Sequence, residues 1–237
     1  MRVRRLTTGV VRQKAGGRVE KYVGDRWRDE TLPVHAFLVE HPTGPVLFDA
    51  GQTARAAGPG WFPRWHPFFR LSRFELGPED ELGPQLRRLG VDPAGVSLVV
   101  LSHLHTDHVG CLDLFTGAEV VVTRTEWKQA TGLEGRLRGY LPEHWPRGLE
   151  PRVVDLDGPA LGPFPASLDL RGDGTLVLVP TPGHTAGHAA LLVRDDDGAT
   201  LLAGDMVHGP QELAEAAPAV AAWCTRENVA VLTAHDT

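Results

Sequence analysis

The stretch SLVVLSHLHTDH, residues 97–108, places an apolar run directly before a cluster of side chains that bind metals. Its first part, Ser97–Leu101, predicts a buried strand. Four potential ligands then follow within a few residues: His103, His105, Asp107 and His108. Because side chains alternate at the end of a strand, His103 and His105 point to the same side. Imidazole and carboxylate groups suit Zn²⁺ and related divalent ions, so this stretch predicts a metal site.

Three further potential ligands each follow a predicted strand farther along the chain: His184 after Leu176–Val179, Asp205 after Thr200–Ala203, and His235 after Val229–Thr233. Loops at strand ends are where α/β scaffolds assemble their sites. A single histidine in such a place is more often structural than a ligand. Four adjacent ligands are rarely all used by one tetrahedral ion, so the whole set favours two metals.

Short apolar runs alternate with helical patterns along the chain. Two hairpins are expected, one from Val34–Glu40 with Val46–Phe48 and one from Ala189–Val193 with Thr200–Ala203. The other expected elements are a strand at Ala118–Thr123 and helices at Glu79–Leu89, at Thr125–Ala130 with Thr125 as the cap, and at Gln211–Trp223 with a kink at Pro218. Strands in both halves with helices between them predict a layered α/β protein with mixed sheets.

No linker divides the chain, so we expect a single domain over residues 1–237. Residues 52–78 form an irregular insertion that is rich in glycine, proline and aromatic side chains. Its aromatic residues cluster within a short stretch: Trp61, Phe62, Trp65, Phe68 and Phe69. Such a cluster suits a small satellite core, an apolar pocket or a homodimer contact.

The composition excludes several classes of function. The chain has 24 Lys and Arg against 30 Asp and Glu, a formal net charge of −6, which disfavours binding to nucleic acid or to anionic membranes. No apolar run is long enough for a membrane span, and no apolar stretch follows the N-terminal arginines, so neither membrane insertion nor a signal peptide is expected. Cys111 and Cys224 cannot form a disulfide framework, and we expect a cytoplasmic protein.

The run His103–His108, followed in order by His184, Asp205 and His235, resembles the metallo-β-lactamase superfamily. The resemblance extends from about Val34 to His235 and includes the run LFDAG at residues 47–51. It implies an αβ/βα four-layer sandwich, in which two mixed β-sheets are flanked by helices and the site lies along one edge. It also implies the ligand sets: His103, His105 and His184 for one metal, Asp107, His108 and His235 for the second, and Asp205 as the bridge.

Within the superfamily the chain is most similar to the N-acyl-homoserine lactonases. Residues 34–51, 102–110 and 181–192 carry this similarity, together with the aromatic insertion. The similarity implies a quorum-quenching hydrolase that opens the lactone ring of N-acyl homoserine lactones with a hydroxide shared by two divalent ions. Zn²⁺ is the expected metal, with Fe, Mn and Co as alternatives. The expected partner is a small acyl lactone or ester.

Two side chains are expected to act on the substrate. Asp107 would pass a proton to the leaving alkoxide while its metal holds it. His208 stands three residues after Asp205, where the lactonases carry a tyrosine that contacts the substrate carbonyl, and an imidazole N–H donates a comparable hydrogen bond. Asp49 is expected to orient a ligand histidine, whereas His188 fits a supporting role and a purely structural one equally well.

Other activities on the same fold stay open. Glyoxalase II-like thioesterases, arylesterases and phosphotriesterases share much of the motif, as do persulfide dioxygenases with one iron at His103, His105 and His184. Class B1 β-lactamases are disfavoured, because they carry a cysteine where Asp205 stands. Two metals per chain would favour a hydrolase, and one iron would favour the dioxygenase.

Overall fold

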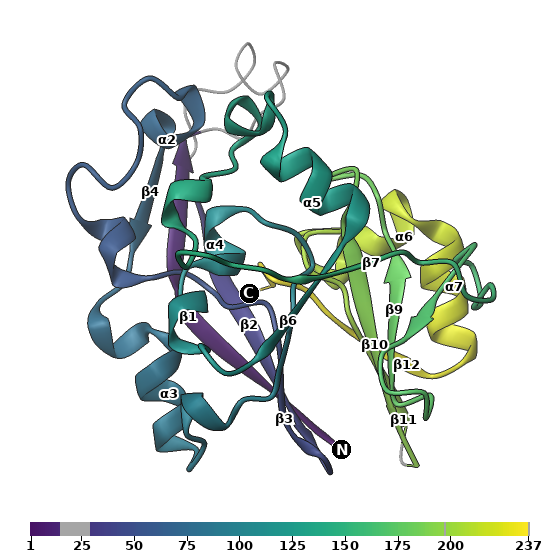
Figure 1. Cartoon of the computed structure of the whole chain (residues 1–237). Helices are drawn as coiled ribbons and strands as arrows, with labels where there is room; N and C mark the ends of the chain where they lie inside the picture. The colour runs from purple at the N-terminus through teal and green to yellow at the C-terminus, as the bar shows by residue number, and fades with distance from the viewer. Residues whose placement is uncertain (15–28, 197, 237) are drawn as a thin grey trace.

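The computed structural model describes residues 1–14, 29–196 and 198–236. Two β-sheets lie face to face and helices cover their outer sides (Figure 1). The strand order is β4-β1-β2-β3-β5-β6-β7 in the first sheet and β12-β11-β10-β9-β8 in the second. Both sheets mix parallel and antiparallel pairs, because β3, β5, β6 and β7 run parallel and so do β11 and β12.

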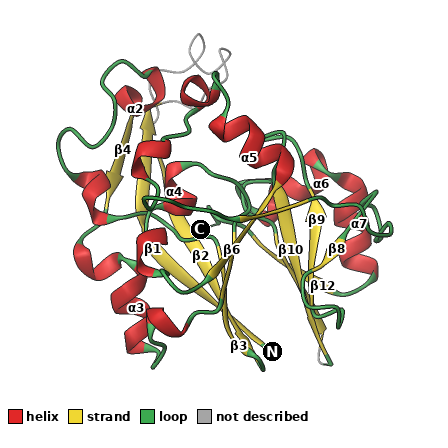
Figure 2. Cartoon of the chain, in the orientation of Figure 1, coloured by secondary structure: helices red, strands yellow, loops and turns green. Residues whose placement is uncertain are grey.

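The first sheet contains β1 (Arg2–Lys14), β2 (Asp29–His41), β3 (Gly44–Phe48), β4 (Ser72–Glu75), β5 (Leu98–Val100), β6 (Glu119–Thr123) and β7 (Arg152–Val154). The second contains β8 (Leu168–Asp169), β9 (Leu176–Pro180), β10 (Ala189–Asp195), β11 (Gly198–Leu202) and β12 (Val229–Leu232). The α-helices are α2 (Pro67–Leu71), α3 (Leu82–Arg88), α4 (Thr106–Val109), α5 (Arg124–Thr131), α6 (Leu213–Ala216) and α7 (Pro218–Arg226) (Figure 2).

Alternating side chains divide the interior into separate layers. Phe37 of β2 and Leu191 of β10 belong to the core between the two sheets. Their neighbours point outward: Leu38 packs in the core under α3, and Leu192 packs with Trp223 of α7. These two central strands thus bury both of their faces, which explains their continuous apolar runs in the sequence. The expected four-layer sandwich of helix, sheet, sheet and helix is confirmed.

Both expected hairpins are present, with Phe37 opposite Phe48 in one and Leu191 opposite Leu202 in the other. The structure differs from the expectation in the helices. The helix near residue 80 begins only at Leu82, after a separate short turn. Thr123, not Thr125, caps α5, because its side chain accepts the N–H of Glu126. Pro218 does not kink a helix but begins α7, because proline is tolerated in the first turn.

Three strands of the first sheet, β1, β4 and β7, were not predicted from the sequence, and neither was β8 of the second sheet. β1 pairs with β2 over most of its length, and β4 pairs with the far half of β1. The insertion at residues 52–78 is therefore not wholly irregular, because it contains α2 and ends in the edge strand β4.

The segment after β12 connects the two sheets. Ala234 donates its N–H to the carbonyl of Gly204, which follows β11 of the second sheet, at 3.1 Å. Its own carbonyl accepts the N–H of His35 in β2 at 2.9 Å. Among the described helices, none has both the length and the apolar character required to cross a membrane.

Candidate metal centre

The expected ligands lie at strand ends that meet where the two sheets adjoin. His103 and His105 follow β5, and α4 begins directly after His105. Asp107 and His108 therefore lie on the first turns of α4. The remaining ligands follow β9, β11 and β12 of the second sheet: His184, Asp205 and His235. All seven predicted residues come together in one place.

Their ligand atoms fall into three overlapping groups, and within each group these atoms lie within 4.8 Å of one another: His103, His105 and His184; His103, His108 and Asp205; Asp107, His108 and His235. The first and third groups are the two ligand sets that the resemblance implied. His103 Nε2 lies 3.0 Å from His105 Nδ1, which lies 2.9 Å from His184 Nε2. Ligands about 2.0 Å from a tetrahedral Zn²⁺ are separated by about 3.3 Å, so this spacing is close to that of a metal site.

Asp205 stands between the two ligand sets, and its two carboxylate oxygens face different sides. Oδ2 lies 3.4 Å from His184 Nε2 and 4.0 Å from His103 Nε2. Oδ1 lies 3.2 Å from His108 Nε2 and 3.4 Å from His235 Nε2. One carboxylate that presents one oxygen to each set is the arrangement expected of a ligand that bridges two metals.

Hydrogen bonds from the opposite ring nitrogens fix the tautomers of these histidines. His105 Nε2 donates to the carbonyl of Arg138 at 3.0 Å, and His235 Nδ1 donates to the carbonyl of Pro33 at 2.6 Å. A carbonyl only accepts, so each of these nitrogens carries the proton. The nitrogen that faces the centre is then the one that can bind a metal, and a metal that binds there displaces any proton on it.

Asp49 orients two further histidines, His108 directly and His103 through Ser102, as expected for a residue that supports the ligands. Its carboxylate accepts the backbone N–H and the hydroxyl of Ser102, each at 2.8 Å, and also His108 Nδ1 at 2.8 Å. Because the Ser102 proton is used by Asp49, the hydroxyl oxygen accepts His103 Nδ1–H at 3.0 Å. Asp49 is fully buried and adopts a φ of 63°.

His188 has a supporting role as well. Its Nε2 accepts the backbone N–H of Asp205 at 3.1 Å, and its Nδ1 donates to Thr181 Oγ1 at 2.7 Å. Gly204 makes this contact possible, because an added Cβ would lie 2.8 Å from His188 Nε2 and the residue has a φ of +53°. His188 thus holds the loop of the bridging aspartate rather than a metal.

The electrostatics of the centre suit cations. Burial lowers the pKa of His105 to about 4 and that of His103 well below its ordinary value, which keeps both imidazoles neutral. Burial also lowers the pKa of His235, but the Asp205 carboxylate outweighs it and raises this pKa to about 9. Burial acts on Asp205 in the direction of a higher pKa, yet His235 and His108 hold this pKa well below its ordinary value. The Asp205 carboxylate therefore stays ionised.

Two buried polar atoms in the centre face each other at 3.2 Å without making a hydrogen bond of acceptable geometry: His108 Nε2 and Asp205 Oδ1. An unpaired buried lone pair costs roughly 1–3 kcal/mol, and a bound cation removes this cost. These orphaned atoms, with the donor set of imidazoles and carboxylates, fit divalent metal ions.

His208 lies at the exposed side of this centre. Its ring centroid is 6.2 Å from that of His235, and its side chain is 61% exposed. Nδ1 lies 3.4 Å from Glu212 Oε2, and the backbone carbonyl accepts the hydroxyl of Thr233 at 3.0 Å. The His208 side chain therefore lies beside His235 at the edge of the centre. Among the described residues, its polar partner is Glu212 and not one of the seven predicted ligands.

The aromatic insertion is partly core and partly exposed. Phe62 stacks on Phe69 with centroids 4.5 Å apart and also packs on Phe74, which forms a satellite core. Trp65 and Phe68 are instead 54% and 42% exposed. His66 donates to the carbonyl of Leu137 at 3.3 Å, one residue before the carbonyl that orients His105. The exposed aromatic rings therefore belong to a segment that packs beside the metal centre.

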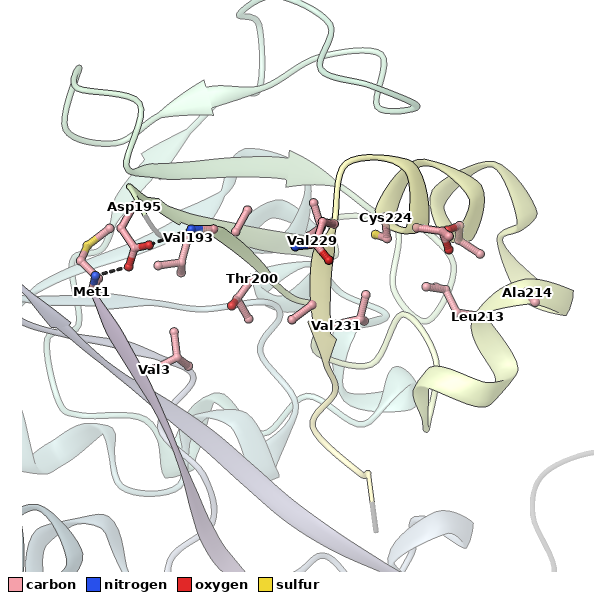
Figure 3. Close-up of a pocket in the computed structure, with 16 residues that line it drawn as sticks. Met1, Val3, Val193, Asp195, Thr200, Leu213, Ala214, Cys224, Val229 and Val231 are labelled. Carbon is pink, nitrogen blue, oxygen red and sulfur yellow. Dashed lines mark hydrogen bonds and ion pairs between the residues drawn. The ribbon is translucent and has the colours of Figure 1, made fainter.

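A cavity of about 820 Å³ lies elsewhere, between the start of β1 and the second sheet (Figure 3). Val3, Val231 and Cys224 line it, and the Met1 amine pairs with Asp195 at its edge. The described residues that line it include none of the seven predicted ligands. The cavity is thus separate from the metal centre.

Some of the groups that build the centre were not predicted from the sequence. Glu126 is fully buried and contacts two loops that carry the histidines of one ligand set, although its position in α5 gave no sign of this. The carbonyls of Pro33 and Arg138 are main-chain groups, which no side-chain pattern reveals. Residues 131–151 carry no clear pattern, so only the structure shows that Arg138 orients His105.

Comparisons with known proteins agree with this geometry. The model of the metallo-beta-lactamase superfamily matches residues 29–228. N-acyl homoserine lactonase AttM of Rhizobium radiobacter is 35% identical over 182 residues, which are 73% of this chain and 64% of that protein. N-acyl homoserine lactonase AiiA of Bacillus thuringiensis subsp. kurstaki is 26% identical over 197 residues, 79% of this chain and 69% of that protein. The chain thus spans a little under two thirds of the AttM relative.

Solved structures have the same fold. An N-acyl homoserine lactone hydrolase, with the product N-hexanoyl-L-homoserine at its catalytic metal centre, aligns with a TM-score of 0.77 at 20% identity and covers 99% of this chain and 92% of its own. AidC, a dizinc quorum-quenching lactonase, aligns with a TM-score of 0.62 at 16% identity and covers 99% of this chain and 87% of its own. With a family match over residues 29–228 and this shared fold, the chain belongs to the metallo-beta-lactamase superfamily.

Proposed function

We propose that the protein is a dinuclear metal-dependent hydrolase that opens the lactone ring of N-acyl homoserine lactones. The Asp205 carboxylate carries this proposal, because its two oxygens face two complete ligand sets. His103, His105 and His184 would hold one ion, and Asp107, His108 and His235 would hold the other. Zn²⁺ is the metal that this set of imidazoles and carboxylates fits best. The curated relatives named N-acyl homoserine lactonases support the choice of substrate.

Bound divalent ions supply two kinds of chemistry, since they lower the pKa of water toward neutrality and polarise a carbonyl group. Asp107 is placed to handle the proton of the reaction. Its side chain is 15% exposed, and its Oδ2 lies 3.8 Å from His235 Nε2. Addition of water to the lactone carbonyl and cleavage of the ring C–O bond leave an alkoxide that needs a proton. We assign this proton transfer to the Asp107 carboxylate, which would accept a proton from the attacking water and pass it to the alkoxide, so that the hydroxy acid forms.

His208 is proposed to bind the substrate carbonyl. With Nδ1 turned toward Glu212, Nε2 is the nitrogen that can reach a bound ligand. Its place beside His235 and on the exposed side of the centre supports this role. The side chain would thus fix the orientation of the acyl group without taking part in metal binding.

The exposed rings of Trp65 and Phe68 are proposed to hold the acyl chain of the substrate. Leu133 and Leu137 are exposed as well and belong to the segment that His66 contacts. Burying a CH₂ group contributes about 0.8 kcal/mol, which corresponds to a roughly fourfold gain in binding for each added carbon. The same exposed surface is the proposed contact if the protein forms a homodimer, which sedimentation velocity would detect.

We also propose that residues 1–237 form a single domain, which the hydrogen bonds of Ala234 to both sheets support. A cytoplasmic location is proposed from the two cysteines. Cys111 and Cys224 are both free and buried, and they suit a reducing compartment.

A substrate panel tests the proposed activity. Purified protein loaded with Zn²⁺ is assayed on short and long N-acyl homoserine lactones, a thioester, an aryl ester, a phosphotriester and a β-lactam. We expect the highest kcat/KM on a lactone, with a rise for longer acyl chains. Turnover of the thioester or phosphotriester without any lactone hydrolysis would show that the proposed substrate is wrong.

Two variants test the acyl-chain surface in the same panel. A double variant with Trp65→Ala and Phe68→Ala should lose the preference for long acyl chains, and its hydrolysis of the shortest lactone should be nearly unchanged. Leu89→Ala removes another exposed apolar side chain and serves as the matched control. An unchanged chain-length preference in the double variant would exclude this surface as the acyl site.

A further inference from the structure

Glu126 is a fully buried acidic residue that none of the roles above uses. It lies in the first turn of α5, the helix labelled in Figure 1. Its Oε1 accepts the backbone N–H of Leu104 at 3.0 Å, and its Oε2 accepts the hydroxyl of Thr185 at 2.7 Å. Leu104 stands between His103 and His105, and Thr185 directly follows His184. A single carboxylate therefore joins the two loops that carry all three histidines of one ligand set.

The rest of α5 strengthens this connection. Gly187 packs so closely on the helix that an added Cβ would overlap the backbone nitrogen of Glu126. Gln129 Oε1, one turn later, accepts the N–H of Ala186 and the hydroxyl of Tyr140, each at 3.2 Å. The Tyr140 ring in turn packs on His105 with centroids 4.9 Å apart. One face of α5 thus contacts both loops of the three-histidine set.

The geometry points to Glu126 as a positioning residue that sets the distance between His184 and the pair His103 and His105. Of the proposed function, this inference requires the two metal sites and does not require the lactone substrate. A buried carboxylate is costly unless its oxygens are satisfied, and here each oxygen is satisfied by a different ligand loop. Loss of the carboxylate would loosen both loops at once, since each of its oxygens holds one of them to α5; the His184 loop would keep its bond from Ala186 N–H to Gln129.

The second ligand set has separate supports. Asp49 fixes His108 at 2.8 Å, and the carbonyl of Pro33 fixes His235 at 2.6 Å. Neither support involves α5. Loss of Glu126 should therefore weaken the metal position at His103, His105 and His184 and preserve the position at Asp107, His108 and His235. This selectivity distinguishes a positioning role from a general contribution to folding.

The test measures metal binding directly, without a lactone. Wild-type protein and the variants Glu126→Ala, Glu126→Gln, Thr185→Val and Lys128→Ala are equilibrated with buffered Zn²⁺ and analysed by elemental analysis and calorimetric titration. Removal of groups that support metal ligands typically costs about 10- to 100-fold in metal affinity. We expect Glu126→Ala to lose this much at one of two sites and Thr185→Val to lose less at the same site. Lys128, exposed on the same helix, provides the matched control.

Glu126→Gln keeps the shape of the side chain and removes its negative charge, so it separates the contributions of the two. It also keeps the inference testable if Glu126→Ala does not fold. Its amide oxygen can accept Leu104 N–H while its NH₂ donates to Thr185 Oγ1, so it should retain most of the affinity. Amide hydrogen exchange adds a readout that needs no metal, since Leu104 N–H should exchange faster in Glu126→Ala than in Lys128→Ala. The inference would be overturned if Glu126→Ala bound metal at both sites as tightly as the wild type, or if it lost the same affinity at both sites. A wild-type protein that binds two metals but hydrolyses no lactone would overturn the proposed function alone.

Discussion

At the scale of single residues, the centre depends on which atom of each side chain is left free. Asp205 shows this most clearly, because its two oxygens face different histidines and its backbone N–H is held by His188. An asparagine at position 205 would keep the shape of the side chain but would present an amide nitrogen to one of the two ligand sets. Since that nitrogen has no lone pair for a metal, the bridge requires a carboxylate.

His208 is the residue whose proposed role can be tested most sharply. A donor to a developing oxyanion typically contributes a factor of roughly 10²–10³ in kcat. His208→Ala should lose activity by about this factor, whereas His208→Tyr should retain much of it because the phenol also donates a hydrogen bond. Steady-state kinetics on a lactone, with metal content measured in parallel, checks both expectations.

The control for His208 is its neighbour Glu212, whose carboxylate lies 3.4 Å from Nδ1. Glu212→Gln keeps a hydrogen-bond acceptor and should change kcat far less than His208→Ala. Wild-type rates for His208→Ala at full metal occupancy would show that this exposed side chain has no catalytic role.

The sequence predicted well which side chains meet in the centre, because the chemistry that singles them out lies in the side chains themselves. His103, His184 and the other predicted ligands all meet in the structure, as expected. Glu126 could not be predicted in the same way. Its partners are a backbone N–H at Leu104 and a hydroxyl at Thr185, 22 and 59 positions away, and a single acidic residue in a helix is normally solvated.

At the scale of elements, α5 is the support on which two ligand loops rest, so its first turn matters. Thr123 Oγ1 accepts the N–H of Glu126 at 3.2 Å and donates to the carbonyl of Gly187 at 2.6 Å. Thr123→Ala removes both bonds and should destabilise the protein by about 1–2 kcal/mol. The melting temperature should fall by roughly 2–8 °C, as measured by calorimetry.

Thr125→Ala is the control for this cap. Thr125 is exposed and lies two positions after Thr123, and the structure gives it no capping bond. The alanine should leave the melting temperature within about 1 °C of wild type. Equal losses in the two variants would contradict the assignment of Thr123 as the cap.

The missed strand β1 shows why alternation alone can fail. Leu6 and Val11 are both buried, although an odd number of positions separates them. A shift in register between Thr7 and Val10, with Gly9 at a φ of 80°, reverses the side-chain faces midway along the strand. The bulge therefore removes the period of two from which a strand is predicted. Hairpins without such a shift, as at Val39 opposite Val46, were predicted correctly.

At the scale of the whole molecule, the ligands join the two sheets. His103 and His108 come from the first sheet, whereas Asp205 and His235 follow strands of the second. Metal binding at this junction should stabilise the fold, by about 2.7 kcal/mol for each site at a hundredfold excess over the dissociation constant. Treatment with a chelator should therefore lower the melting temperature by roughly 5–10 °C or more, and added Zn²⁺ should restore it.

A variant that lacks one of the predicted metal ligands shows whether the stabilising ions bind at this centre. Asp205→Ala removes the proposed bridge, so the chelator should change its melting temperature much less than that of the wild type. A chelator effect of equal size in Asp205→Ala would indicate that the stabilising ions bind elsewhere.

The spacing of the ligands along the chain also has a kinetic consequence. His103, His105, Asp107 and His108 are neighbours before any folding, whereas His235 is 132 positions from His103 (235 − 103 = 132). Contacts between such distant positions close large loops and form late. A newly synthesised chain would therefore first meet metal through residues 103–108 alone, with incomplete coordination. Excess metal during refolding should capture this early state, so the order in which metal and denaturant are removed should decide the yield of active protein.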